Sequence, residues 1–340
     1  MPAQDLQSIA AALVAEGKGI LAADESFPTI EKRFTGIDIE SSEENRRAYR
    51  DLLFTTDGVE EFISGVILFD ETVHQSASDG TPFPQLLEAK GIVPGIKVDG
   101  GAKDLALHDG EKVTEGLDGL RGRLKEYYEK GNRFTKWRAV INIGESIPSD
   151  YCIEANSDAL GRYAALSQEG GFVPIVEPEV MMDGGHSIDR CYEVTARMLE
   201  ALFAELKRAR VDLTGTLLKT NMVLSGVDAS QRAGVEEVAR RTVDVLKGTV
   251  PDEIPGVVFL SGGQTDEQST AHLNEMNKIG PHPWELSFSY GRALQAPALE
   301  AWKGESSNVE AAQKALYHRA KLNSAARSGS YTSDMENAAA

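Results

Sequence analysis

Eight short apolar segments recur along this 340-residue chain and constrain its fold more than any other feature. Each segment is almost continuously hydrophobic, rather than alternating between apolar and polar residues. That pattern is typical of parallel strands that are buried on both faces of a sheet. The segments lie at residues 19–23, 63–69, 92–98, 138–143, 172–177, 214–219, 257–261 and 285–290.

The spacing of the segments leaves room for a helix after each strand. The seven intervals between residues 19 and 285 have a mean length of 38 residues, and a β–α unit needs roughly 30. Several stretches between and after the segments carry apolar residues at helical spacing. The helices predicted in this way lie at 40–53, 158–168, 188–210, 231–246 and 309–322.

These elements favour one (β/α)8 TIM barrel of the α/β class, because no linker or shift in composition divides the chain. We assign residues 1–326 to this single barrel domain. After Arg327 the sequence loses its apolar period, so residues 327–340 are expected to form a flexible C-terminal tail. A doubly wound open sheet is the structural alternative, because periodicity cannot show whether a sheet closes.

The charge balance and the cysteine content exclude several classes of protein. The chain carries 35 basic and 53 acidic side chains, a net charge of −18. Proteins that bind nucleic acid or anionic membranes present Lys and Arg to phosphates, so we expect neither partner. Cys152 and Cys191 show no repeated spacing, which favours a reducing compartment. No apolar run approaches 18 residues, so we expect no membrane span. Residues 1–17 contain no Lys or Arg, so we expect no secretory signal. We therefore expect a cytoplasmic protein.

Lys219 is the most informative single residue, because it ends an apolar or small run at 213–218. A buried ammonium group is costly unless it is paired or neutralised. Burial and neighbouring cations, for which Lys97 and Lys136 are candidates, favour the neutral amine, which attacks carbonyl carbon. Taken alone, Lys219 also fits a lysine that extends its charge to solvent at a strand end.

Two further groups of residues follow strands, where a barrel places its functional side chains. The Ser261-Gly262-Gly263 turn allows backbone N–H groups to approach a phosphate, and Arg292 would be the matching cation. The acids Asp24, Glu177 and Glu179 are candidates for proton transfer. The alternatives are a plain turn and a set of acids that balances the local lysines.

Metal and nucleotide motifs are missing from the sequence. The six histidines form no HExxH pattern, no CxxC pair occurs, and neither Walker nor dinucleotide glycine patterns are present. A GxSxG serine elbow is also missing. We therefore expect no metal and no cofactor.

With these residues in place, the chain resembles the class I fructose-1,6-bisphosphate aldolases, which act through a Schiff base. Seven motifs carry the resemblance, and they occur in family order from near the N-terminus to residue 295. They are GILAADES at 19–26, GIKVD at 95–99, KWR at 136–138, IVEPE at 175–179, GTLLK at 215–219, FLSGGQ at 259–264 and FSYGRALQ at 288–295. The resemblance implies a metal-independent lyase of glycolysis and gluconeogenesis, and a homotetramer.

The resemblance also implies a role for each catalytic candidate. Lys219 matches the lysine that forms the Schiff base with the substrate ketone. Glu177 matches the acid that assists carbinolamine dehydration, and Lys136 matches the lysine beside it. Asp24 matches the base that takes the proton of the C4 hydroxyl, and Glu179 matches an acid that holds the lysine network.

The remaining matched residues are implied to bind a sugar bisphosphate through its two phosphates. One phosphate site is matched by Ser261, Gly262, Gly291 and Arg292. The other phosphate end is matched by Lys97, Arg138 and Ser26. These cations would concentrate positive charge in one barrel mouth against an acidic exterior.

The chain departs from the family pattern in two places. Phe27, Pro28 and Thr29 stand where the family usually has Thr-Gly-Ser. Animal members end in a tyrosine that reaches the active site, whereas this chain ends in Ala340, with Tyr331 nine residues before it. The first departure leaves another sugar open, such as sedoheptulose or tagatose bisphosphate or a monophosphate. A barrel that serves mainly as a scaffold for basic partner proteins is the alternative from another class.

Overall fold

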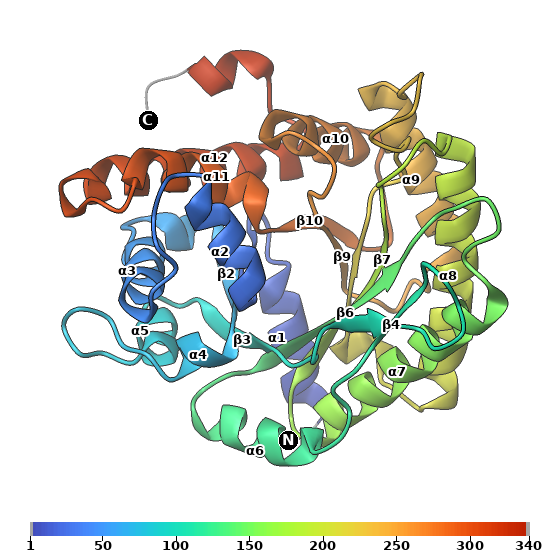
Figure 1. The fold of residues 1–340 in the computed structure, drawn as a ribbon, viewed down its shortest axis with the longest axis horizontal. Helices are drawn as coiled ribbons and strands as arrows, with labels where there is room; N and C mark the ends of the chain where they lie inside the picture. Colours follow the sequence, from blue (N-terminus) through green and yellow to red (C-terminus); the bar gives the residue numbers. More distant parts are fainter. Residues whose placement is uncertain (1–2, 338–340) are drawn as a thin grey trace.

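Eight parallel strands close into a barrel in the computed structural model, which describes residues 3–337 (Figure 1). Around the barrel the strands follow one another in the order β1, β10, β9, β8, β7, β6, β3 and β2. Their bounds are β1 (Gly19–Ala23), β2 (Ile63–Leu68), β3 (Val93–Lys97), β6 (Phe134–Ile141), β7 (Val173–Val180), β8 (Leu217–Thr220), β9 (Gly256–Phe259) and β10 (Glu285–Tyr290). A separate antiparallel hairpin consists of β4 (Ala102–Asp104) and β5 (Lys112–Thr114). The predicted (β/α)8 barrel is confirmed.

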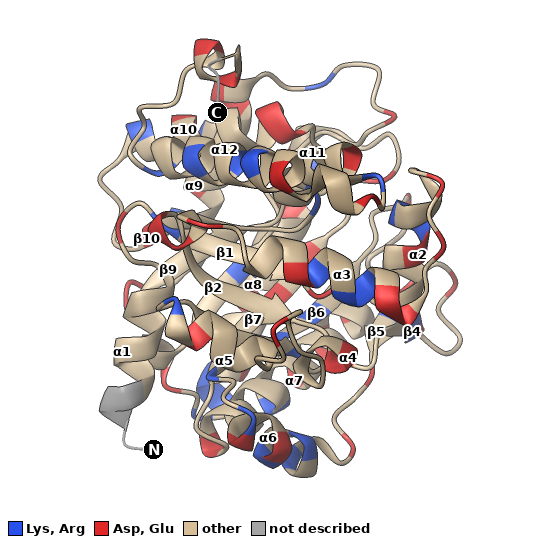
Figure 2. Cartoon of the chain, turned by 90° about the vertical axis from the view of Figure 1, so that its left-hand side faces the viewer, with Lys and Arg blue, Asp and Glu red and all other residues tan. Residues whose placement is uncertain are grey.

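Helices surround the barrel, and α11 and α12 lie side by side near the C-terminal end of the chain (Figure 1). The helix bounds are α1 (Ala3–Leu13), α2 (Phe27–Thr35), α3 (Glu43–Phe54), α4 (Asp70–Val73), α5 (Phe83–Ala89), α6 (Leu120–Glu129), α7 (Asp150–Glu169), α8 (Ile188–Arg208), α9 (Val235–Thr249), α10 (Asp266–Ile279), α11 (Arg292–Trp302) and α12 (Val309–Arg327). Short 3-10 turns occur at Val59–Glu61, Leu213–Gly215, Ser306–Asn308 and Ser333–Asn337. Figure 2 shows acidic and basic residues interspersed on the outer helices α3 and α6.

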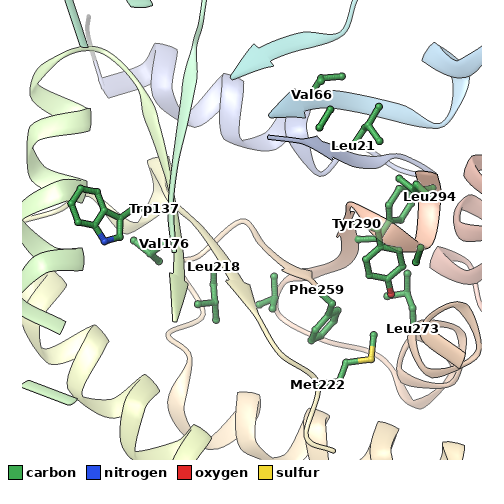
Figure 3. Close-up of a cluster of buried hydrophobic side chains, with 14 of the residues drawn as sticks. Leu21, Val66, Trp137, Val176, Leu218, Met222, Phe259, Leu273, Tyr290 and Leu294 are labelled. Atoms are coloured by element: carbon green, nitrogen blue, oxygen red, sulfur yellow. The ribbon is translucent and has the colours of Figure 1, made fainter. Parts of the chain in front are cut away.

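Each barrel strand sends alternate side chains into the barrel and outward to the helices. On β1, Leu21 and Ala23 join the outer cluster, while Ile20 and Ala22 join the inner one. The outer cluster is drawn in Figure 3, where residues from neighbouring strands point toward the helices. Because both faces of every strand are covered, the segments read as continuous apolar runs in the sequence.

The first helix closes the amino-terminal end of the barrel. Leu6, Ala10 and Leu13 of α1 pack in the inner cluster with Phe134 and other inward side chains. The ring of Phe134 fits there because Gly95 carries no side chain: a Cβ at Gly95 would lie 2.4 Å from that ring. The interior is therefore apolar and filled at this end, so a polar cavity can form only at the carboxyl end.

The fourth predicted strand begins earlier in the structure than the sequence indicates. The sequence predicts a strand at 138–143, whereas β6 begins at Phe134. Lys136 and Arg138 interrupt the apolar run and hide the start of the strand. They therefore lie within β6 rather than at its start, and their side chains line the cavity at the carboxyl end of the barrel.

The fifth predicted strand is longer than expected. The sequence predicts a strand at 172–177, which places Glu177 at its end and Glu179 after it, whereas β7 continues to Val180. Proline is tolerated here because β8 pairs with β7 only at Ile175 and Val176, so no partner on that side needs its missing N–H. Both glutamates are therefore inner-face residues of a buried strand.

Residues 328–337 make contacts that a flexible tail would lack. The side chain of Tyr331 is buried, and its hydroxyl donates a hydrogen bond to Glu336 at 2.8 Å. Glu336 also forms an ion pair of 2.6 Å with Arg319 of α12, and the Tyr331 N–H donates to Asn274 of α10. The last three residues assigned to that tail lie outside the described residues. Within the described part of the chain, no helix combines the length and hydropathy needed to cross a membrane.

Candidate active site

One cavity of about 260 Å³ lies at the carboxyl end of the barrel, and all twelve residues matched from the sequence line it. They come from seven different places in the chain and meet because the strands are parallel and the barrel is closed. The residues are Asp24, Ser26, Lys97, Lys136, Arg138, Glu177, Glu179, Lys219, Ser261, Gly262, Gly291 and Arg292.

The two-residue period of the strands explains why charged residues converge in this cavity. On β7, Val173 and Ile175 point into the apolar inner cluster, so Glu177 and Glu179 continue the same face toward the carboxyl end. On β8, Leu217 belongs to the inner cluster and Lys219 follows it two residues later. Both strands are therefore apolar on their inner face near the amino-terminal end of the barrel and charged near the carboxyl end.

A chain of ion pairs links the four central side chains. Lys136 Nζ lies 2.6 Å from Asp24 Oδ2 and 3.2 Å from Glu177 Oε2. Lys219 Nζ lies 3.2 Å from the other oxygen of the same glutamate. Glu177 therefore bridges two lysines, and the side chains of both lysines and of Glu177 are at most 5 % exposed.

The ion pairs keep these groups charged despite their burial. Burial alone would raise the pKa of Asp24, but Lys136 and Lys219 outweigh it and lower this pKa to about 2. Burial also opposes the ionised form of Glu177, and the same two lysines nevertheless hold its pKa below the usual value. Burial disfavours the charged form of Lys136, yet Asp24 and Glu177 raise its pKa. At neutral pH the centre therefore holds two carboxylates and a lysine cation between them.

One end of the cavity, here named the turn end, consists of Ser261, Gly262, Gly291 and Arg292. Arg292 Nη2 donates to the carbonyl oxygens of Ser261, at 3.1 Å, and of Gln264. Gly291 precedes the first residue of α11, so backbone N–H groups at a helix N-terminus face this end. The turn end thus combines a guanidinium group with backbone donors.

The turn end is held in place by close packing against Met182 and by a contact between Gln264 and the buried His272. Gly263 has a φ of +71°, and a Cβ there would lie 2.1 Å from Met182 Cγ, so only glycine fits. His272 of α10 is buried, and its Nδ1 lies 2.7 Å from Gln264 Oε1. Burial, with a contribution from Arg232, lowers the pKa of His272 to about 4, so the imidazole is neutral at pH 7.

The opposite end, here named the cation end, consists of Ser26, Lys97 and Arg138. Its cations are bound to carboxylates: Lys97 Nζ lies 2.6 Å from Asp99 Oδ1, and Arg138 pairs with Glu179. Ser26 Oγ lies 3.2 Å from the hydroxyl of Thr29, at the start of α2. The cation end therefore offers side-chain donors rather than a backbone turn.

Sequence reasoning missed several residues of the cavity wall. Glu25, Thr29 and Arg33 also line it, together with Ala22, Leu260 and Ser289. Glu25 is buried between Arg33 and Arg50, with which it forms two ion pairs. The sequence contained a signal for these residues. Glu25 lies inside the first motif, and Arg33 follows it by eight residues, within α2. The lining holds six basic and four acidic side chains, whereas the whole chain carries −18.

The comparison with protein families identifies one family over nearly the whole chain. The family model described as fructose-bisphosphate aldolase class-I matches residues 5–340. Among curated proteins, a probable fructose-bisphosphate aldolase class 1 of Xanthomonas axonopodis is 60% identical over 332 residues, which cover 97% of this chain and 99% of that protein. The cytosolic fructose-bisphosphate aldolase 4 of Arabidopsis thaliana is 51% identical over 98% of this chain and 85% of its own length.

A solved structure has the same fold. The fructose-bisphosphate aldolase of Plasmodium falciparum, crystallised with TRAP and a small molecule inhibitor, superimposes with a TM-score of 0.96 at 49% identity. The match covers 98% of this chain and 97% of that one.

Proposed function

The chain belongs to the class I fructose-bisphosphate aldolase family, which cleaves fructose 1,6-bisphosphate reversibly through a lysine Schiff base, and we propose that Lys219 is that lysine. The products are dihydroxyacetone phosphate and glyceraldehyde 3-phosphate. The reaction needs no metal, because the protonated imine withdraws the electrons that a metal would otherwise polarise. The observation that carries the assignment of residues is the buried chain of contacts Asp24–Lys136–Glu177–Lys219.

Formation of the Schiff base begins with a proton transfer from Lys219 to Glu177, which lie 3.2 Å apart. The neutral amine then attacks C2 of the substrate and gives a carbinolamine. Glu177, now protonated, returns the proton to the C2 hydroxyl, which leaves as water. Glu177 thus acts first as base and then as acid, a role that suits an ionised carboxylate held beside the amine.

Cleavage of the C3–C4 bond requires removal of the proton from the C4 hydroxyl. Asp24 is ionised at neutral pH and lies at the other side of Lys136, so it is placed to accept this proton. The electrons of the broken bond flow into the iminium and form an enamine, while the aldehyde product leaves. Lys136 stays protonated throughout, and its charge keeps both carboxylates ionised between steps.

The two ends of the cavity are suited to the two phosphates. We assign the phosphate on C1 to the turn end and the phosphate on C6 to the cation end. Glu179 holds Arg138 in the wall of the cation end, which supports its expected role as an acid that organises the cations. This arrangement fixes the substrate at both ends and leaves C2 to C4 over the central ion pairs.

Reductive trapping tests the assignment of Lys219. Sodium borohydride added with substrate should reduce the imine and attach the substrate to Lys219, which peptide mass spectrometry would locate. Lys219→Met should lower kcat by about 10⁴-fold or more, because the nucleophile is lost. Lys247→Met, an exposed lysine of α9, is the matched control and should retain wild-type activity. Label on another lysine, or loss of activity in EDTA, would contradict the assignment.

We also infer a cytoplasmic homotetramer. The likeness to cytosolic relatives supports the compartment. Two exposed apolar side chains support association between copies of the chain. Leu107 is fully exposed in the loop between β4 and β5, and Tyr151 is half-exposed. The Tyr151 ring lies 5.0 Å from the ring of His108 in the same loop. Light scattering should give four times the mass of one chain, 36.8 kDa. A monomer at micromolar concentration would contradict the tetramer without affecting the chemistry.

A further inference from the structure

Met181 directly follows β7 and lies beside the cation end of the catalytic cavity. The inner face of β7 carries Glu177 and Glu179, and the two-residue period of the strand places Met181 next on that face. Its backbone N–H donates to the carbonyl oxygen of Ile141 at 2.9 Å, so the strand geometry continues through this residue. Its sulfur atom lies 3.7 Å from Arg138 Nη2, which donates a hydrogen bond to it. A thioether thus contacts one of the two cations of the cation end.

The guanidinium group of Arg138 is held on two sides and open on a third. Its Nε pairs with Glu179, and its Nη2 donates to the sulfur of Met181. Within the described part of the chain, no residue accepts a hydrogen bond from Nη1. The side chain is 39 % exposed and lines the catalytic cavity. With the C6 phosphate assigned to this end, that phosphate would bind Nη1 and compete with the sulfur for Nη2.

The chemical state of the Met181 sulfur decides this competition. A thioether sulfur is a weak acceptor, so a phosphate oxygen displaces it from Nη2 at little cost. Oxidation of the thioether to a sulfoxide puts a polar oxygen beside the guanidinium group. A hydrogen bond from a charged donor to a polar oxygen is stronger than one to a thioether, so the sulfoxide would keep Nη2. The phosphate would then lose part of its contact with Arg138.

Met181 is one of few methionines that an oxidant in solution can reach. The chain contains seven, of which Met1 lies outside the described residues. Among the described ones only Met181 and Met335 are partly exposed. The others are at most 7 % exposed, and they are Met182, Met198, Met222 and Met276. Cys152 and Cys191 are buried, and burial raises the pKa of both thiols, so neither offers a reactive thiolate.

We propose that Met181 is a reversible oxidation site, at which hydrogen peroxide forms a methionine sulfoxide that weakens phosphate binding by Arg138. The proposal rests on the proposed function, because it assigns the C6 phosphate to the cation end. A sulfur lone pair attacks one peroxide oxygen, so that an S–O bond forms while the O–O bond breaks. The released hydroxide takes the proton of the transferred OH group and leaves as water. Sulfur loses two electrons and the peroxide gains them, and methionine sulfoxide reductases reverse the change.

The test measures steady-state kinetics with fructose 1,6-bisphosphate on the full-length enzyme, before and after limited treatment with hydrogen peroxide. Peptide mass spectrometry measures the sulfoxide at each methionine. Met181 should be oxidised faster than the four buried methionines. KM should rise about five- to tenfold with kcat near its untreated value, because a substrate-binding contact is lost. Methionine sulfoxide reductases A and B, one for each epimer, should together restore KM.

Variants show whether the effect passes through Met181 and Arg138, each variant being compared with its own untreated form. Met181→Leu keeps the volume but removes the sulfur, so its KM should not respond to peroxide. Met335→Leu, at the other partly exposed methionine, is the matched control and should respond as wild type does. Arg138→Ala should have a raised KM before treatment and show no further rise, because the sulfoxide has lost its partner. Met181→Gln, which carries a permanent amide oxygen, should have a higher untreated KM than Met181→Leu.

The outcomes separate this proposal from the proposed function. An unmodified Met181, an unchanged KM in enzyme oxidised there, or an undiminished response in Met181→Leu or Arg138→Ala would overturn the oxidation site. A fall in kcat with unchanged KM would place the damage away from the cation end and would also overturn it. Untreated wild type that fails to cleave fructose 1,6-bisphosphate, or to trap Lys219, would instead contradict the proposed function.

Discussion

The two ends of the cavity, to which we assign the two phosphates of the substrate, present different kinds of donor groups. The turn end presents backbone N–H groups and Arg292, backed by a glycine turn that fits against Met182 and by the buried His272–Gln264 pair. The cation end presents long side chains, Lys97 and Arg138, each bound to a carboxylate and bordered by a second cavity.

This difference indicates that the two ends recognise the substrate differently. Backbone donors cannot follow a phosphate that moves, so with the C1 phosphate assigned to the turn end we expect this end to fix the half of the sugar that carries the reacting ketone. Lysine and arginine side chains can turn, so the cation end can accept aldehyde halves of different length. The enzyme would therefore be strict at one end of its substrate and tolerant at the other.

The largest expected effect lies between the two ends, at Lys136. Lys136→Met removes the cation that pairs with Asp24 and Glu177, so both acids lose the partner that keeps them ionised. We expect kcat to fall by about 10²–10⁴-fold. Lys97→Met, at the cation end, should instead raise KM by about tenfold with a small change in kcat, because it removes one phosphate contact. Steady-state kinetics on both variants measure the contrast, and equal effects on kcat would refute it.

The next effect concerns the pH dependence of stability at the turn end. The pKa of His272 is lowered from 6.5 to about 4 in the folded state, so the unfolded chain binds this proton more readily. Stability from this group is therefore full above pH 6.5 and falls by about 3 kcal/mol as the pH drops from 6.5 to 4. His272→Asn lacks this titration, so its free energy of unfolding should fall less over that range. Urea unfolding at fixed protein concentration measures the free energy of unfolding of both proteins at each pH. An equal decrease in wild type and His272→Asn between pH 6.5 and 4 would contradict the prediction.

The smallest effect separates two glycines with similar backbone angles. Gly263, at the turn end, and Gly101, which lines the second cavity beside the cation end, have φ values of +71° and +89°. An alanine at either position is strained by the positive φ. At Gly263 its Cβ would also clash with Met182, whereas a Cβ at Gly101 has open space around it. We expect Gly263→Ala to destabilise the fold by about 2 kcal/mol more than Gly101→Ala. The Met182→Ala background should narrow that gap, and equal thermal unfolding of the two single variants would argue against a rigid turn end.

The sequence predicts which residues line the cavity, because each lies in a short motif near the end of an apolar strand. Lys219 follows Leu217 and Leu218, so the sequence alone shows a lysine at the end of an apolar run. The errors in strand bounds arise at charged residues within strands. The sequence starts one strand at Arg138 and ends another at Glu177, since a local pattern cannot reveal that an inner face changes from apolar to charged along one strand.

The sequence had no means of finding the contacts that depend on barrel closure. Nothing in the local pattern brings Asp24 within 2.6 Å of Lys136, 112 residues later, or His272 under the turn at Gln264. Those distances depend on the tilt and stagger of the strands, which set how far each inner residue lies from its neighbours. The second cavity that borders the cation end also depends on barrel closure, because its wall joins β3, β6 and the start of α2.

The sequence by itself therefore determined the eight strands of the barrel and the α/β class, because buried apolar runs and the spacing between them are local properties. Only the tertiary structure decided which charges pair and which lysine shares Glu177 with Lys219. Coulomb interactions fall with distance and rise with burial, and both quantities exist only after the chain has folded.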